Sequence, residues 1–411
     1  MAPTQAPRKI NSEVDISAGA VASIYSVRFA SKWREQPFLA RQCDECLSVS
    51  SFLFLYSTLT KPEMTTQPLL ITMGDAAGIG PEIIAKAFQN HPADTADCVV
   101  VGDVATMRRA AALVKSSLAL PVAELESLAR FEPIPHCIQV LQKCDLLAPV
   151  SIGLVTGLSG KAAADCIVWA ARAVLNGQAR AMVTAPVNKE ALAAAGGWVA
   201  QFPGHTEMLQ AEAAKFLGKA VADVPVRMML ANDELKTVLV SIHMSLRQAI
   251  DAVTVDSVLQ TLRITHSALS KTLGTSSNFV PHIGVAGLNP HAGEGGLFGK
   301  EEQIIISPAI AAARAEGMHV SGPFAPDTVF MRARSKSGLF GEFDVVVAMY
   351  HDQGLIPVKY LGVEQGVNVT LGLPLIRTSP DHGTAFDIAG TGKADEASLI
   401  AAIRMARKLA S

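Results

Sequence analysis

Five histidines stand in segments that favour chemistry, each close to glycine or polar residues near the end of an expected strand or the start of an expected helix. They are His205, His243, His291, His351 and His382. Three neutral imidazoles from separate strands, with one coordination position left open, suit a catalytic divalent metal such as zinc. The alternative for each is a core histidine whose hydrogen bonds are satisfied by its neighbours. Spacing leaves both interpretations open.

His351 is the first candidate because of the segment that precedes it. Residues 345–349 form an apolar, β-branched run that ends in His-Asp-Gln-Gly. Such a run predicts a buried parallel strand, and open α/β sheets bind ligands beyond the carboxyl ends of their strands. We therefore expect His351 to face a ligand.

Two cations and an amide follow His351 in a glycine-rich region: Lys359, Asn368 and Arg377. A guanidinium presents a planar fork to phosphate or carboxylate, and an ammonium presents a point charge. Arg377 stands between the apolar residues 373–376 and the segment 378–381, an unusual place for a solvated charge. The pattern favours an anionic substrate over ordinary surface charge.

Residues 74–82, Gly-Asp-Ala-Ala-Gly-Ile-Gly-Pro-Glu, join the first expected strand to a helix. The third glycine of the dinucleotide-binding fingerprint is absent, as is the Gly-Lys-Ser/Thr of a P-loop. A glycine-rich turn before a helix can bind an anion through backbone N–H groups, or it can be a plain tight turn. Both interpretations stay open here.

Strand and helix patterns alternate from residue 69 onward, which predicts an α/β fold with a largely parallel sheet covered by helices on both faces. We expect strands at 69–73, 98–101, 181–184, 226–230, 237–242, 283–286, 345–349 and 367–370. We expect helices at 81–88, 104–114, 160–175, 253–269, 300–315 and 397–409. Asn232-Asp233 predicts an antiparallel hairpin between two of the strands.

Composition limits the partners of this 411-residue chain. The net charge is −2 and the basic residues are scattered, which argues against nucleic acid or an anionic membrane. The six cysteines are too sparse for a disulfide scaffold, so we expect reduced thiols and a cytoplasmic protein, with a zinc site at Cys43 and Cys46 as a lesser alternative. The apolar runs are shorter than the ~18 residues that a spanning helix needs.

Residues 1–65 lack sustained periodicity, and Met64 is followed by an ordinary first strand. We expect these residues to be a disordered extension or a start-site artefact and residues 66–411 to form the functional unit.

Several segments together resemble the 4-hydroxythreonine-4-phosphate dehydrogenase family of pyridoxal phosphate biosynthesis. They are MGDAAGIGPE, TAPVNKEAL, PGHTE, SIHMSLR, GLNPHAGEGGLFGKEE, GPFAPDTVF, AMYHDQGLIPVKY and GVNVTLGLPLIRTSPDHGTAFDIAGTGKAD. The resemblance extends from about Leu69 to the C-terminus. It implies a two-lobed fold like that of isocitrate and isopropylmalate dehydrogenases, with the active site in the cleft between the lobes. DHGTAFDIAG also resembles the adenosine-binding loop of those enzymes.

The resemblance assigns roles to individual residues. It implies a divalent metal, zinc with cobalt or magnesium as alternatives, one of whose ligands comes from the second subunit of a homodimer; the ligands are His243, His291 and His351. The implied contacts to the phosphorylated substrate are His205, Thr206, Lys359, Asn368 and Arg377. The implied contacts to NAD or NADP are His382, Gly383, Thr384, Ala385 and Asp387. Asp327 and Lys189 are the candidate catalytic residues.

The implied reaction is oxidation of the 3-hydroxyl of 4-phosphohydroxy-L-threonine to a 3-oxo acid, which loses carbon dioxide to give 3-amino-2-oxopropyl phosphate. Relatives that oxidise 4-phospho-D-threonate or 4-phospho-D-erythronate in carbon catabolism are an alternative, because the metal, phosphate and cofactor groups would be shared. A zinc hydrolase and a sugar-phosphate-binding module are alternatives of other classes, but they leave the DHGTAFDIAG segment or the histidines without a role.

Overall fold

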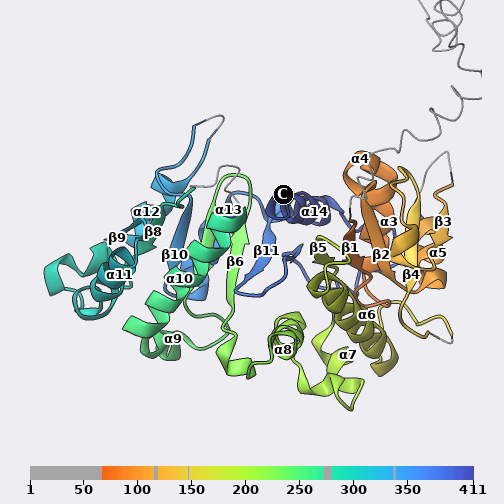
Figure 1. The fold of residues 1–411 in the computed structure, drawn as a ribbon, viewed down its shortest axis with the longest axis horizontal. Coiled ribbons are helices and arrows are strands. Elements are labelled where there is room, and N and C mark those ends of the chain that lie inside the picture. The colour runs from red at the N-terminus through yellow and green to blue at the C-terminus, as the bar shows by residue number, and fades with distance from the viewer. Residues whose placement is uncertain (1–66, 115–118, 147, 273–278, 337–338) are drawn as a thin grey trace, which may run out of the picture. The chain divides into compact units, whose positions relative to one another are not determined.

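One sheet of twelve strands carries the fold in the described part of the computed structural model, residues 67–114, 119–146, 148–272, 279–336 and 339–411. The strand order is β3-β4-β2-β1-β5-β12-β11-β6-β7-β10-β8-β9 (Figure 1). Neighbouring strands are parallel except in the pairs β6–β7, β6–β11 and β11–β12. The prediction of a largely parallel α/β sheet is confirmed. The predictions for residues 1–65, including Met64 and the Cys43–Cys46 pair, lie outside the described residues.

The elements have the following bounds. The strands are β1 (Leu69–Thr72), β2 (Cys98–Gly102), β3 (Val122–Glu124), β4 (Ile138–Gln142), β5 (Ala181–Thr184), β6 (Arg227–Ala231), β7 (Lys236–Leu239), β8 (Ile283–Ala286), β9 (Val320–Phe324), β10 (Val345–Ala348), β11 (Val367–Leu371) and β12 (Arg377–Pro380). The helices are α3 (Gly80–Asn90), α4 (Pro92–Thr95), α5 (Val104–Leu113), α6 (Gly157–Leu175), α7 (Lys189–Ala194), α8 (His205–Leu217), α9 (Leu246–Ala252), α10 (Val255–Thr272), α11 (Ser307–Ala315), α12 (Pro326–Ala333), α13 (His351–Tyr360) and α14 (Ala397–Leu409).

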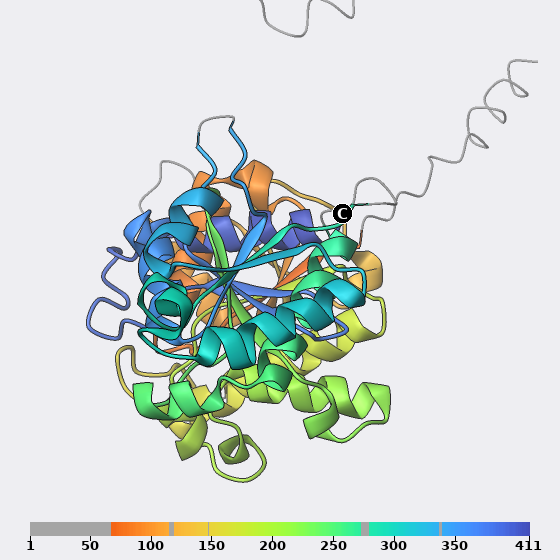
Figure 2. The same ribbon diagram turned by 90° about the vertical axis from the view of Figure 1, so that its left-hand side faces the viewer.

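The central strands are continuous apolar runs because helices cover both of their faces. Every residue of β1, β5 and β10 is buried, as expected for parallel strands between two helical layers. Helix α6 packs on β1, β2 and β5, and α14 packs on β5 and β12. Figure 2 looks along the sheet and shows its strands fanning out, the twist that L-amino acids impose.

Local sequence sets several of the helix starts. The side chains of Asp103, Thr156 and Asn188 each accept a hydrogen bond from a backbone N–H in the first turn of α5, α6 and α7. Ser245 and Gln248 form a capping box at α9. These caps satisfy N–H groups that have no partner within the helix.

The predicted hairpin at Asn232-Asp233 is confirmed: β6 and β7 are antiparallel. The Asn232 side-chain oxygen accepts from the backbone N–H groups of Glu234 (2.9 Å) and Leu235 (2.8 Å), which fixes the turn. Strands β3, β4, β9 and β12 were not predicted from the sequence. Strand β12, Arg-Thr-Ser-Pro, is fully buried without an apolar pattern, so periodicity does not reveal it.

Some predicted boundaries were wrong. Strand β10 ends at Ala348, and His351 begins α13 instead of ending the strand. The helix predicted at 300–315 is a π-helical turn, Glu302–Ile306, followed by α11, whose start contains Pro308. The helix predicted at 253–269 is α10, Val255–Thr272, preceded by a separate helix, α9.

The described cysteines, Cys98, Cys137, Cys144 and Cys166, are buried free thiols. Within the described ranges, none of the helices combines the length and the apolar character required to cross a bilayer.

The proposed division of residues 66–411 into two lobes stays a prediction.

Candidate active site

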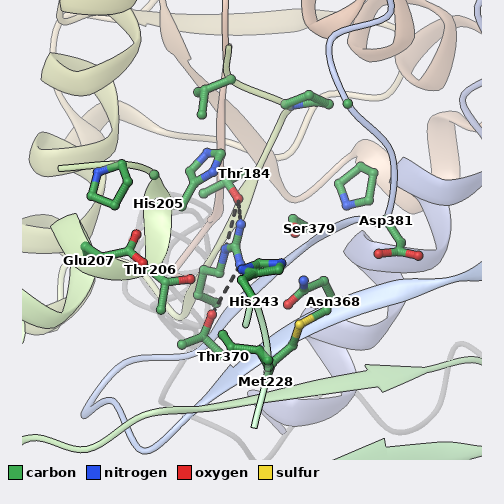
Figure 3. Close-up of a pocket in the computed structure, with 18 of the residues that line it drawn as sticks. Thr184, His205, Thr206, Glu207, Met228, His243, Asn368, Thr370, Ser379 and Asp381 are labelled. Carbon is green, nitrogen blue, oxygen red and sulfur yellow. Dashed lines mark hydrogen bonds between the residues drawn. The ribbon is translucent and has the colours of Figure 1, made fainter. Parts of the chain in front are cut away.

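A cavity of about 390 Å3 opens at the ends of β5 and β7, beside β11 and β12 and the first turns of α8 and α13 (Figure 3). Ten of the residues selected from the sequence line it: Lys189, His205, Thr206, His243, His351, Lys359, Asn368, Arg377, His382 and Gly383. The fold therefore brings together segments that are far apart in the chain. The selected residues that do not line this cavity are His291, Asp327, Thr384, Ala385 and Asp387.

Arg377 is a buried cation in the wall of this cavity, with 4% of its surface exposed. Its Nε and Nη2 donate to the Thr184 hydroxyl at 2.9 and 2.7 Å, and Nη1 donates to the Thr370 hydroxyl at 3.2 Å. Figure 3 labels both threonines. Burial lowers the pKa of Arg377 to about 10, so the group remains charged at neutral pH.

Among the described residues Arg377 forms no salt bridge; the charge of Glu207, which also lines the cavity, acts on it without a hydrogen bond. The hydrogen-bond acceptors of Arg377 are neutral hydroxyls, which do not cancel a charge. Burying a cation without a salt-bridge partner costs free energy, because the lost hydration is not replaced by direct contact with an opposite charge. The cavity around Arg377 therefore suits an anionic ligand, which would supply a negative charge in direct contact with the guanidinium.

Lys359, in the last turn of α13, forms an ion pair with Asp381, with Nζ and Oδ2 2.6 Å apart. Asp381 is mostly buried and lines the same cavity. An anion that approaches Lys359 therefore competes with a carboxylate already in place.

His205 begins α8, is partly buried and lines the cavity. Burial lowers its pKa well below the ordinary value of 6.5, and the neighbouring charge of Arg377 lowers it further. The ring is therefore neutral at pH 7, and its Nε2 has no hydrogen-bond partner among the described residues. Thr206 follows in the first turn of α8, where the helix dipole also favours a negative ligand.

His243 and His351 meet at the cavity, with ring centroids 5.7 Å apart and planes inclined by 44°. Desolvation, and then the charges of Lys189 and His351, lower the pKa of His243, so its ring is neutral at pH 7. Nδ1 of His351 lies 2.7 Å from the Asp352 carboxylate, which orients the ring and leaves Nε2 for another partner.

His291 does not join the other two imidazoles within one chain. It is exposed, at φ 51°, in the Pro290–Gly296 turn after β8. The described residues contain no group of three His, Cys, Asp or Glu side chains placed to hold a metal. The turn itself is firmly held, because the buried Glu302 carboxylate accepts from the backbone N–H groups of Leu288 (2.8 Å) and Asn289 (2.7 Å).

The two candidate catalytic residues lie in different places. Lys189 is exposed at the start of α7 and lines the cavity. Asp327 is exposed in the first turn of α12 and does not.

The segment 382–387 begins at the edge of the cavity and continues away from it. His382 and Gly383 line the cavity, whereas the Thr384 carbonyl accepts a hydrogen bond of 3.0 Å from the Ile79 backbone N–H, in the glycine-rich turn after β1. Ala385 adopts a positive φ of 41°.

Six polar residues that line the cavity were not predicted from the sequence: Thr184, Glu207, Arg227, Thr370, Ser379 and Asp381. Three of them had a usable signal in the sequence. Thr184 ends a predicted strand, and Thr370 lies two residues after Asn368, on the same face of β11. Asp381 directly precedes the segment assigned to the cofactor.

Comparison with known proteins gives a consistent set of relatives. The family described as Pyridoxal phosphate biosynthetic protein PdxA matches residues 94–406. The 4-hydroxythreonine-4-phosphate dehydrogenase of Beijerinckia indica subsp. indica is 50% identical over 346 residues, which cover 84% of this chain and 96% of that protein. The D-threonate 4-phosphate dehydrogenase of Salmonella typhimurium is 44% identical over 350 residues, covering 84% and 100%.

A solved structure is also similar over nearly the whole described region. The 4-hydroxythreonine-4-phosphate dehydrogenase of Klebsiella pneumoniae has a TM-score of 0.73 and 41% identity, and the match covers 84% of this chain and 100% of that one.

Thr184→Val replaces the hydroxyl that accepts two hydrogen bonds from Arg377 with a methyl group of similar size. We expect the free energy of unfolding, measured with urea, to fall by roughly 1–3 kcal/mol, because buried donors lose their acceptor. Thr72 is the matched control: it pairs with Thr184 in the register of β1 and β5, and its buried hydroxyl has no partner among the described residues. Thr72→Val should change the stability by less than about 0.5 kcal/mol. Equal losses in both variants would contradict this role of Arg377.

The partly buried, neutral His205 predicts that stability depends on pH. Its folded pKa lies well below the ordinary 6.5, so the stabilisation is fully present above about pH 6.5 and is lost as the pH falls, by at most about 1.4 kcal/mol per pH unit. Urea denaturation from about pH 7.5 to about pH 5.5 measures it, and His205→Gln should flatten the dependence. Parallel curves for the two proteins would show that another group is responsible.

Proposed function

The chain belongs to the family of the pyridoxal phosphate biosynthetic protein PdxA, and we propose that it is an oxidoreductase that uses NAD or NADP to oxidise the 3-hydroxyl of 4-phosphohydroxy-L-threonine. The observation that supports the phosphorylated substrate most directly is Arg377, a buried cation that lines the cavity and whose hydrogen bonds in the described residues go to neutral hydroxyls instead of a carboxylate.

The substrate phosphate would lie between Arg377, Lys359 and Asn368. A phosphate would give Arg377 a directly hydrogen-bonded counter-ion, and Lys359 would add a second charge once it exchanges Asp381 for the ligand. The amide of Asn368 and the first turn of α8, with His205 and Thr206, supply neutral hydrogen-bonding groups. Binding the phosphate at one end of the cavity places the carbinol at the other, which is a positioning effect.

The neutral state of His205 matters for this arrangement. An imidazolium beside Arg377 would add a second positive charge to a desolvated site, and burial disfavours that state. The neutral ring can donate one hydrogen bond and accept another, so it can orient a ligand without altering the net charge of the cavity.

His243 and His351 are suited to hold a divalent cation, for which we propose zinc, with cobalt and magnesium as alternatives. Both rings reach the cavity, and Asp352 orients His351 with Nε2 free. Of the three implied ligands, only these two line the described cavity of one chain, so the third ligand in the proposal is His291 from a second copy in a homodimer. The exposed turn that carries His291 suits that role.

When bound, the cation would make the substrate hydroxyl more acidic, and the nicotinamide would accept the hydride. The oxidised product is a 3-oxo acid, whose carbonyl accepts the electron pair released as carbon dioxide leaves, giving 3-amino-2-oxopropyl phosphate. In this proposal His382, Gly383, Thr384, Ala385 and Asp387 hold the adenosine end of the dinucleotide. Lys189 and Asp327 remain candidate catalytic groups, although of the two only Lys189 lines the cavity.

A second candidate substrate is 4-phospho-D-threonate, which the name of the 44% identical relative from Salmonella typhimurium supports. It carries the same phosphate and a hydroxyl at the same carbon, so Arg377 and Lys359 would serve both substrates.

Formation of reduced nicotinamide tests the proposal. We expect the absorbance of NADH or NADPH to grow with 4-phosphohydroxy-L-threonine, to stop after chelation and to return with Zn²⁺. Unphosphorylated 4-hydroxy-L-threonine should react poorly, because it does not give Arg377 a directly hydrogen-bonded counter-ion. Faster reduction with 4-phospho-D-threonate would select the second candidate, and no reduced cofactor with either substrate would refute the dehydrogenase proposal.

Mixing two inactive variants tests whether the metal site is shared between chains. His291→Ala and His351→Ala should each abolish turnover and metal retention. If His291 acts in the second copy, subunit exchange creates dimers with one intact site, and roughly a quarter of the wild-type turnover returns on random mixing. If His291 and His351 serve the same chain, the mixture stays inactive. Unmixed samples of each variant are the controls.

A further inference from the structure

We propose that Glu82 and Lys86, on the first two turns of α3, clamp the loop of residues 381–394 in the form that binds the dinucleotide. This inference rests on the proposed function, because that loop carries the residues assigned to NAD or NADP. It gives a role to the glycine-rich turn after β1, which the sequence left open.

Four of the amides in the turn of residues 74–80 have partners within the protein. The backbone N–H of Asp75 donates to the Pro186 carbonyl (2.9 Å), and those of Ala77 and Gly78 donate to Asp75. The N–H of Ile79 donates to the Thr384 carbonyl at 3.0 Å. Through the hydrogen bond of Ile79, the turn contacts the loop of residues 381–394.

The close approach of the turn to Thr384 explains why Gly78 is a glycine. A Cβ at Gly78 would lie 3.0 Å from both the Cβ and the carbonyl oxygen of Thr384. That distance is shorter than ordinary van der Waals contact, so a larger residue would push the loop away from α3. Gly78 therefore sets how near the cofactor segment lies to β1.

Glu82 fastens the far end of the same loop. Its side chain is 2% exposed, and its two oxygens accept from the backbone N–H groups of Gly390 (3.0 Å) and Ala394 (2.9 Å). Gly390 has a φ of 74°, in the left-handed region that glycine adopts without strain. Hydrogen bonds to an ionised carboxylate are about twice as strong as neutral ones.

Lys86, one turn later, completes the clamp. Its ammonium donates to the carbonyl of Gly392 at 2.8 Å and to that of Ala394, and it lies 3.7 Å from the Glu82 carboxylate. The two side chains thus bind both the donors and the acceptors of residues 390–394. The loop lacks helix and strand hydrogen bonds of its own from residue 381 to 394, so these contacts replace them.

The consequence is preorganisation. Phe386 and Ile388 pack against the core in the middle of the loop, and the clamp restrains the segment on its C-terminal side. A restrained loop loses less conformational entropy when it binds a ligand. Releasing it should weaken dinucleotide binding while leaving the phosphate site around Arg377 unchanged, because Arg377 lies on β12, before the loop begins.

Glu82→Gln tests the clamp, because it removes the charge but keeps the size of the side chain. We expect the Kd of NAD or NADP, measured by calorimetry, to rise roughly tenfold, the size of effect expected for one charge-assisted hydrogen bond. The KM of the phosphorylated substrate should change less than about twofold. Lys86→Met, at a more exposed position, should raise the cofactor Kd by a smaller factor. This variant tests the same clamp if Glu82→Gln folds poorly.

Asp103→Asn is the matched control. Asp103 is another buried carboxylate bound to backbone N–H, at the start of α5, and has no contact with the loop. This variant should lower the melting temperature without changing the cofactor Kd.

Lys393 provides a readout that is independent of activity, because it is an exposed lysine within the clamped segment. Trypsin should cut there faster in Glu82→Gln than in the wild type or Asp103→Asn, and added NAD or NADP should protect it. If the wild type binds neither nucleotide, the proposed function is wrong. If it binds one and Glu82→Gln matches it in both Kd and cleavage at Lys393, the clamp is wrong.

Discussion

The burial of one positive charge governs the centre of this molecule. Arg377 lies on β12 between β5 and β11, and the hydroxyls of Thr184 and Thr370 satisfy its donors without neutralising it. The two threonines lie on β5 and β11, the strands on either side of β12 in the sheet. The buried charge of Arg377 is also the reason why the cavity suits an anion, because a phosphate would provide a hydrogen-bonded counter-ion, which the threonine hydroxyls do not.

Two other buried charges, both glutamate carboxylates, stabilise loops near this centre. Glu302 holds the turn that carries His291, and Glu82 holds the loop that follows β12. Each carboxylate is buried and accepts from backbone N–H groups, so desolvation is offset by charge-assisted hydrogen bonds. Irregular segments with strained dihedral angles, such as those at His291 and Ala385, thereby keep defined conformations.

Periodicity and turn chemistry predicted much of the fold. The strands 181–184 and 283–286 and the final helix 397–409 have the expected bounds, because strong apolar patterns and clear flanking residues define them. The prediction failed where other forces dominate. Strand β12 is polar and is held by its neighbours, and His351 begins a helix because β10 ends earlier than its apolar run. Tertiary contacts decided both cases.

The sequence by itself determined the α/β class, the family and the residue types that the chemistry requires, since these depend on local pattern and on motifs. Only the tertiary structure decided which of those residues meet. It brings His243, His351, Lys359 and Arg377 to one cavity and leaves His291 and Asp327 outside it, and it turns the glycine-rich segment into a support for another loop. The physical reason is that convergence depends on strand order and register, which long-range packing sets.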